Sequence, residues 1–206
     1  AAKYATVGIG TPDFSKGITV SVTADFGSNA DNWERLIDFG SGAQTNNILF
    51  ARQGTSNNLS FQLYSGASIL LDCVATGAIS AGLKEYRAVV DGTNCRLYID
   101  GVLKNTVAST AVPLTAARTS NYIGKSNWAD AAFEGSIQKV SVYNYPVVSQ
   151  DVANCEQQYA GTTLAASVTL AGADCVVKFT AGTGTWVAPR GVSNIRALII
   201  GGGGAG

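Results

Sequence analysis

The chain has 206 residues and balances 14 Lys and Arg against 14 Asp and Glu, so its formal net charge is zero and only 14% of its residues are charged. Recognition of nucleic acids and of anionic membrane surfaces depends on clustered Lys and Arg, so neither is an expected partner. The sequence contains no His. This absence excludes Ser-His-Asp and Cys-His nucleophile systems, His-ligated zinc and His proton shuttles within these residues.

Composition predicts an all-β protein. The chain has 24 Gly but only four Glu, and it is rich in Thr, Val, Ile and Asn, which suit short strands and tight turns better than helices. Its longest apolar runs are strand-sized, far below the roughly 18 residues of a membrane span, so no membrane insertion is expected. The chain begins on Ala1 without an initiator Met, and we expect a processed or excised product.

Alternation of apolar and polar residues is the clearest local signal. It begins at residues 18–24, where Ile18, Val20, Val22 and Ala24 fall on one face, as a half-buried strand requires. Many short strands at close spacing predict a two-sheet sandwich rather than parallel β-α-β units. The further strands are expected at residues 35–39, 47–52, 59–64, 68–74, 85–90, 95–99, 102–107, 121–124 and 136–143.

Two Asp-Gly pairs separate three of these runs, at residues 91–92 and 100–101. Asp-Gly between strand patterns favours a positive backbone φ and therefore a tight hairpin turn. Residues 85–107 are expected to form a three-stranded meander.

One short helix is predicted after the last strand of the sandwich. Ser149 can cap it, residues 150–159 form its body, and Gly161 suits the left-handed position that follows a helix. The composition then changes, because residues 162–206 contain no Glu and end in GGGGAG. We therefore expect a sandwich domain over residues 1–161 and a glycine-rich β extension over 162–206.

The four Cys lie at positions 73, 95, 155 and 175, too far apart for a Cys-x-x-Cys metal or redox motif. Their even number and wide spacing predict disulfides, and we favour Cys73 with Cys95 and Cys155 with Cys175. Four buried free thiols are the alternative. The triplet at residues 58–60 makes Asn58 a candidate glycosylation site.

Residues 88–103 read AVVDGTNCRLYIDGVL, and this stretch resembles the central signature of laminin-G-like domains in the concanavalin A-like lectin and glucanase superfamily. Residues 18–26 resemble the opening strand of such domains, and residues 135–144, GSIQKVSVYN, resemble the closing one. The resemblance covers about residues 1–160. It implies a jelly-roll sandwich that serves as a secreted recognition or adhesion module. Such domains often carry Trp and His before the central strand, where this chain has KEYR at 84–87.

The tail has a resemblance of its own. Residues 179–192 read FTAGTGTWVAPRGV and precede the apolar run 195–200 and the glycines, which is similar to the start of a glycine-rich domain of surface and fibre proteins. Gly201, Gly203 and Gly206 formally fit a dinucleotide-binding fingerprint. No helix or acidic residue follows them, so cofactor binding is not expected.

Glucanases of the same superfamily use two nearby carboxylates, commonly supplied by closely spaced Glu and Asp on one strand. This chain has no such arrangement, and its four Glu lie far apart in the sequence. We therefore expect no enzymatic activity.

Two loops combine an indole with amide and carboxylate groups. Trp33 follows Asp31 and Asn32, and Trp128 follows Asn127. An aromatic face with directional hydrogen bonds suits a sugar, which makes Trp33, Asn127 and Trp128 the candidate ligand residues. The alternative is that both Trp side chains close the ends of the sandwich core.

Laminin-G-like domains often hold a calcium ion near a sheet rim through oxygen ligands, which calcium prefers. By oxygen chemistry and loop position, the candidate ligands here are Asp31, Asp38, Asn127 and Asp130. Calcium is the one cofactor that the resemblance suggests. Solvated or turn-forming Asp is the alternative.

The leading hypothesis is a non-catalytic extracellular or cell-surface module for recognition, adhesion or structure within a larger surface or fibrous protein. Its partner would be a glycan, another extracellular protein or a second copy of the chain. The second hypothesis is a calcium-assisted carbohydrate-binding lectin domain.

Overall fold

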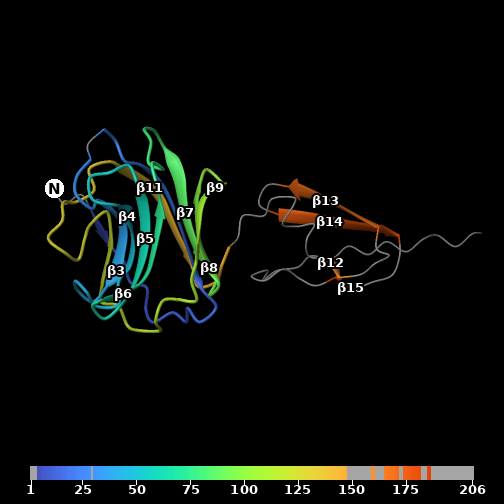
Figure 1. The fold of residues 1–206 in the computed structure, drawn as a ribbon, viewed down its shortest axis with the longest axis horizontal. Helices are drawn as coiled ribbons and strands as arrows, with labels where there is room; N and C mark the ends of the chain where they lie inside the picture. The colour runs from blue at the N-terminus through green and yellow to red at the C-terminus, as the bar shows by residue number, and fades with distance from the viewer. Residues whose placement is uncertain are drawn as a thin grey trace, which may run out of the picture. The chain divides into compact units, whose positions relative to one another are not determined.

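The computed structural model describes residues 4–28, 30–147, 159–160, 165–171, 174–181 and 185–186 (Figure 1). The chain divides into two compact units, Ala1–Val147 and Val148–Gly206. The boundary expected at residue 161 lies inside the second unit.

The first unit consists of two antiparallel sheets that face each other across a common core (Figure 1). The six-stranded sheet has the order β1-β10-β3-β4-β5-β6, and the five-stranded sheet has the order β11-β2-β7-β8-β9. The all-β prediction of a two-sheet sandwich is confirmed. The strands are β1 (Ala5–Thr6), β2 (Ile18–Asp25), β3 (Arg35–Gly40), β4 (Ile48–Arg52), β5 (Leu59–Ser65), β6 (Ser68–Ala75), β7 (Lys84–Val90), β8 (Asn94–Ile99), β9 (Val102–Ala108), β10 (Ser120–Ile123) and β11 (Ser136–Tyr143).

The local patterns in the sequence explain these strands. The apolar residues of β2, Ile18, Val20, Val22 and Ala24, are all fully buried, because alternate side chains of a strand point to the same face. The meander expected at 85–107 forms from β7, β8 and β9. Between β8 and β9, Asp100 and Gly101 have φ values of 49° and 77°, the positive φ that a tight hairpin turn requires.

Aromatic rings fill much of the space between the sheets. Phe26 contacts Tyr86 and Phe133 edge to face, with ring centroids 5.3 Å and 5.1 Å away. Phe50 and Phe61 form a similar pair at 5.7 Å. Edge-to-face contacts add about 0.5–1.5 kcal/mol each to the stabilisation that burial provides. The core therefore holds the sheets in a fixed relation and supports the outer face of each sheet.

Cys73 on β6 and Cys95 on β8 are both buried free thiols in this core. Burial and the adjacent Cys73 side chain raise the pKa of the Cys95 thiol. The two residues come from facing sheets and contact each other, so the Cys73–Cys95 disulfide stays a prediction that this contact supports. For the other pair, Cys155 and the side chain of Cys175 lie outside the described residues.

The described residues of the second unit form two pairs of antiparallel strands. β12 (Tyr159–Ala160) pairs with β15 (Thr185–Trp186), and β13 (Ala165–Ala171) pairs with β14 (Asp174–Ala181). The helix expected over 150–159 lies outside the described residues except for Tyr159, which is in β12, and so does the glycine run at 201–206. The described part of the chain contains no helix that could span a membrane.

Candidate functional site

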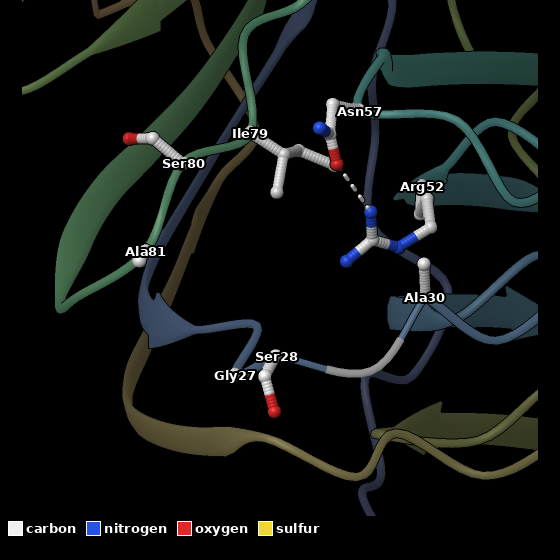
Figure 2. Close-up of a pocket in the computed structure, with 8 residues that line it drawn as sticks. All are labelled: Gly27, Ser28, Ala30, Arg52, Asn57, Ile79, Ser80 and Ala81. Carbon is white, nitrogen blue, oxygen red and sulfur yellow. Dashed lines mark hydrogen bonds between the residues drawn. The ribbon is translucent and has the colours of Figure 1, made fainter.

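A small cavity of about 210 Å³ opens among the loops at one end of the sandwich (Figure 2). Ser28 and Ala30 line it from the β2–β3 loop, and Asn57 and Ser80 line it from the loops after β4 and β6. Arg52, at the end of β4, supplies its one charged side chain.

The Arg52 guanidinium is committed to the protein itself. Its Nε donates to Glu34 Oε2 at 2.7 Å, and its Nη1 donates to the Ser56 carbonyl and Asn57 Oδ1, each at 3.0 Å. Arg52 and Glu34 are both almost completely buried. Burial raises the pKa of Glu34, and the Arg52 guanidinium opposes that rise. This buried ion pair ties β4 to the β2–β3 loop, which makes the cavity a weak candidate for ligand binding.

A cluster of polar side chains lies on the outer face of the six-stranded sheet, which is the face that points away from the core. The register of the ladder places Asp38, Leu49, Gln62 and Asp72 side by side across β3, β4, β5 and β6. Directly paired residues of an antiparallel ladder point to the same face. One row of the sheet thus carries two carboxylates and an amide on its outer surface.

A β-bulge brings Arg35 into this cluster. The register of β3 against β4 shifts between Arg35 and Ile37, so Arg35 pairs with Ala51, and Ile37 pairs with Phe50. Arg35 and Asp38 are an odd number of residues apart and would point to opposite faces of a regular strand. The extra residue in the bulge turns Arg35 to the outer face, which is a common role of bulges near binding sites.

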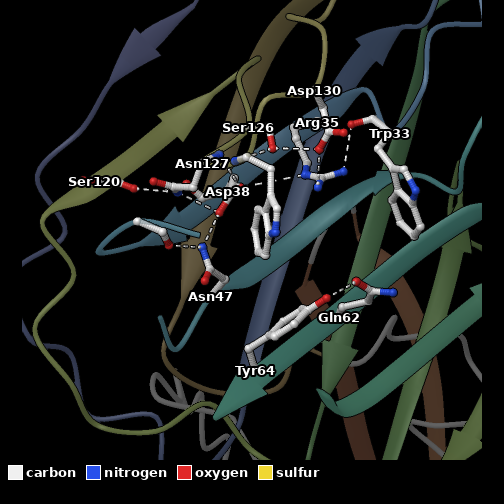
Figure 3. Close-up of polar contacts among 12 residues, drawn as sticks. Trp33, Arg35, Asp38, Asn47, Gln62, Tyr64, Ser120, Ser126, Asn127 and Asp130 are labelled. Carbon is white, nitrogen blue, oxygen red and sulfur yellow. Dashed lines mark hydrogen bonds and ion pairs between the residues drawn. The ribbon is translucent and has the colours of Figure 1, made fainter. Parts of the chain in front are cut away.

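Arg35 is held from several sides (Figure 3). Its Nη1 donates to the Trp33 carbonyl at 2.8 Å, its Nη2 donates to Asp130 Oδ2 at 3.0 Å, and its Nε lies 3.8 Å from Asp38 Oδ2. The guanidinium also lies 5.3 Å from the Trp33 ring centroid and 5.5 Å from that of Trp128. Burial lowers the pKa of Arg35, and the Asp38 and Asp130 carboxylates oppose this shift.

Two indole rings lie against the guanidinium, a tyrosine ring lies beside one of them, and all three keep part of their surface accessible. Trp33, Trp128 and Tyr64 are half-buried, and the Tyr64 and Trp128 ring centroids are 5.7 Å apart. Neither Trp belongs to the buried core, so the alternative that they close the core ends is wrong. Trp33 also has a φ of 54°, an uncommon conformation for a bulky residue and one that costs free energy.

Asn127 fixes the loop that carries Trp128. Its backbone N–H donates to Asp38 Oδ2 at 2.7 Å, and its Nδ2 donates to Asp38 Oδ1 at 2.8 Å and to the Ser120 carbonyl at 3.0 Å. Asn47 Nδ2 adds a further bond to Asp38 Oδ1 at 2.9 Å. Burial raises the pKa of Asp38, whereas these donors and Arg35 lower it. These bonds give Asn127 a positioning role, and its role as a ligand residue stays a prediction.

The candidate calcium ligands are only partly brought together. Asp38, Asn127 and Asp130 lie close to one another, but the cation between the two carboxylates is the Arg35 guanidinium. Among the described residues, no group of three or more His, Cys, Asp or Glu side chains is arranged to hold a metal ion. Because N–H donors already occupy the oxygens of Asp38, these residues do not fit a calcium ion.

Asn58, the candidate glycosylation site, lies just before β5. Its Nδ2 donates to Gln53 Oε1 at 3.1 Å, and its Oδ1 accepts from the Gly77 N–H at 2.9 Å. Ser60, the third residue of the triplet, is buried and donates to Asp72 Oδ1 at 3.0 Å. The Asn58 amide is thus held within the fold, and its glycosylation stays a prediction.

The outer-face site is the name used below for Trp33, Arg35, Gln62, Tyr64, Trp128 and Asp130. Its rings offer apolar faces and Asp130 is partly exposed, whereas Gln62, on the same sheet face, is buried. Tyr64 Oη and Gln62 Oε1 lie 3.4 Å apart, and burial raises the pKa of the Tyr64 hydroxyl. Sequence reasoning named the two Trp residues and Asp130. It missed Arg35, Gln62 and Tyr64, although alternation along 59–64 could have placed Gln62 and Tyr64 on one face.

The Laminin_G_3 family model, described as concanavalin A-like lectin/glucanases superfamily, matches residues 2–153. No curated protein sequence matches the chain significantly. The glycine-rich resemblance of the tail has no counterpart in these matches and stays a prediction.

Several solved structures share the fold at low sequence identity. The CBM40 of the Ruminococcus gnavus IT-sialidase is 16% identical, covers 70% of this chain and 92% of its own, and has a TM-score of 0.54. The same CBM40 bound to α2,3-sialyllactose is 17% identical over 71% and 91% of the two chains, with a TM-score of 0.52. Mouse laminin α1 domains LG4-5 are 15% identical over 68% and 38%, with a TM-score of 0.51. At such identity these likenesses concern the fold alone.

Proposed function

Because the chain belongs to the concanavalin A-like lectin/glucanases superfamily, we propose that its first unit is a non-catalytic carbohydrate-binding module that binds glycans at the outer-face site. The observation that carries this proposal is the set of three half-buried rings, with Trp33 and Trp128 against the fixed Arg35 guanidinium and Tyr64 beside Trp128. Sugar rings present C–H faces that pack against aromatic side chains, while their hydroxyls need directional hydrogen bonds.

The geometry also preorganises the site. Arg35 bonds to the Trp33 carbonyl and to Asp130, and Asn127 anchors the loop of Trp128 to Asp38. Binding therefore requires little ordering of side chains, and this lowers the entropic cost of association. The CBM40 structures bound to sialyllactose show that a protein of this fold can bind glycans, which supports the proposal.

A catalytic role is not proposed for the carboxylates at this site. Asp38 is fully buried, and both of its oxygens accept hydrogen bonds from the protein, so it cannot contact a ligand. Asp130 is paired with Arg35 at 3.0 Å. Glycoside hydrolysis needs two carboxyl groups that flank the bond to be cleaved, one of them able to donate a proton.

Recognition of glycans at a cell surface or in the extracellular space is the setting that we propose for such a module. Adhesion by self-association stays a second hypothesis. A native-mass measurement at micromolar concentration tests it, because a strict monomer would contradict self-association while leaving glycan binding untouched.

The direct experiment screens the full chain against a broad glycan array and then titrates the strongest ligands. Trp33→Ala and Trp128→Ala are expected to weaken binding by at least tenfold, the usual loss when a central aromatic contact is truncated. Trp186→Ala is the matched control, since Trp186 belongs to the second unit, and it should leave affinity unchanged. Absence of binding to any glycan, or equal loss in all three variants, would refute the proposal.

A further inference from the structure

We propose that the outer-face site selects uncharged glycans and discriminates against glycans that end in a carboxylate-bearing sugar such as sialic acid. This inference rests on the proposed function and deepens it. It is opposite to what the sialyllactose complexes of the structurally similar CBM40 would suggest by analogy, and it follows from the charges of this chain.

The first step concerns the one cation in the site. Arg residues recognise carboxylates through pairs of parallel N–H donors. Arg35 is 4% exposed, and one N–H on each of its terminal nitrogens is already used, by the Trp33 carbonyl and by Asp130. Its guanidinium carbon lies within 5.5 Å of both indole rings, so the aromatic groups restrict approach to it. The Nε–H has no hydrogen-bond partner in the part of the chain that the structure describes, but it is buried and faces Asp38 Oδ2 at 3.8 Å, so the guanidinium presents no exposed pair of N–H donors to an incoming carboxylate.

The second step concerns the anions. Asp130 keeps 18% of its side chain exposed, and Asp72 is exposed beside Gln62 on the same sheet face. Asp38, fully buried on β3, lies 3.8 Å from Arg35. Even with Asp38 protonated, the carboxylates of Asp72 and Asp130 outnumber the single guanidinium. A sialic acid carboxylate at this face would therefore meet net repulsion.

The third step concerns the nearest cation along the same loop, Lys125. Its ammonium lies 4.5 Å from the Tyr4 ring centroid and 4.6 Å from that of Tyr122. These cation–π contacts hold its charge at the β1–β10 edge of the sheet. Arg118 is likewise buried and donates to the Asn46 and Leu114 carbonyls. Neither side chain compensates the carboxylates of the site.

The experiment compares oligosaccharides with their sialylated derivatives, lactose and 3′-sialyllactose among them, by array and by calorimetric titration of the full chain. The best uncharged ligand is expected to bind at least tenfold more tightly than its sialylated derivative at low salt. Asp72→Asn keeps an oxygen that can accept the Ser60 hydrogen bond but removes one negative charge. At about 0.1 M salt it should narrow the affinity ratio between the uncharged and sialylated ligands by about fivefold, as expected for two unit charges roughly 8 Å apart near a protein surface and screened over a Debye length of about 10 Å.

The outcomes separate the two claims. If sialylated ligands bind as tightly as their uncharged parents, or if Asp72→Asn leaves the ratio unchanged, the charge selectivity is refuted while glycan binding stands. If no ligand of either series binds, the proposed function fails and the selectivity fails with it. Preference for the uncharged series, reduced by Asp72→Asn and by added salt, supports the inference.

Discussion

Asn127→Ala tests whether this residue positions the site rather than contacts the ligand. The variant removes the hydrogen bonds that Nδ2 donates: one to the buried Asp38 carboxylate at 2.8 Å, one to the Ser120 carbonyl at 3.0 Å, and a longer one to the Asp38 carbonyl at 3.4 Å. A hydrogen bond to a charged group contributes about 1.5–3 kcal/mol, and a neutral one contributes about 0.5–1.5 kcal/mol. The free energy of unfolding should therefore fall by about 2–4 kcal/mol.

Equilibrium unfolding in urea, followed by circular dichroism, measures this loss. Asn94→Ala is a suitable control, because the Asn94 amide donates to the neighbouring Thr93 hydroxyl at an exposed site, and its effect should stay below about 0.5 kcal/mol. Asn127→Asp should be at least as damaging as Asn127→Ala, since it places a second carboxylate against Asp38. A loss below 0.5 kcal/mol for Asn127→Ala would refute the reasoning, and the residue would then be free to act as a ligand.

Three further predictions concern acid stability, thiol chemistry and metal dependence. Burial raises the pKa of Asp91, but hydrogen bonds from Thr93 and Arg96 outweigh it and hold that pKa below its usual range. The stabilisation from Asp91 is thus present above the ordinary pKa of about 3.9 and is lost as pH falls through the folded-state pKa. The free energies of unfolding of Asp91→Asn and wild type should therefore converge as the pH is lowered into this range. Oxidation should join Cys73 and Cys95, which intact mass and peptide mapping detect as a loss of two hydrogens. The disulfide should raise the free energy of unfolding by about 3 kcal/mol. Thiols that stay reduced under oxidant would contradict this pairing. Chelator should leave glycan affinity unchanged in calorimetric titrations, and a large loss that calcium restores would show that the outer-face site was interpreted wrongly.

The strands were predictable because their signals are local. Alternation in β2 and the Asp-Gly pair before β9 depend only on neighbouring residues, and both appear as expected. The contacts of the site are not local. Trp33 and Trp128 both lie over Arg35 although 95 positions separate them in the chain, and no pattern within either loop indicates that they meet.

Arg35 shows most clearly why the site could not be predicted in full. Strict alternation along β3 would place Arg35 on the face of Ile37 and Phe39, which are core residues. The bulge between Arg35 and Ile37 reverses that assignment, and no Gly or Pro marks it in the sequence. For the same reason, the choice of candidate calcium ligands did not anticipate a guanidinium between Asp38 and Asp130.

The most direct measurement of the central claim uses the three Trp residues of the chain as probes. Their indole N–H signals, assigned through Trp→Phe variants, are followed by NMR while the strongest glycan from the array is added to the full chain. Glycan binding at the outer-face site predicts that the signals of Trp33 and Trp128 shift together to saturation while that of Trp186 stays in place. Saturable binding without a shift at Trp33 or Trp128 would place the glycan elsewhere and contradict the account.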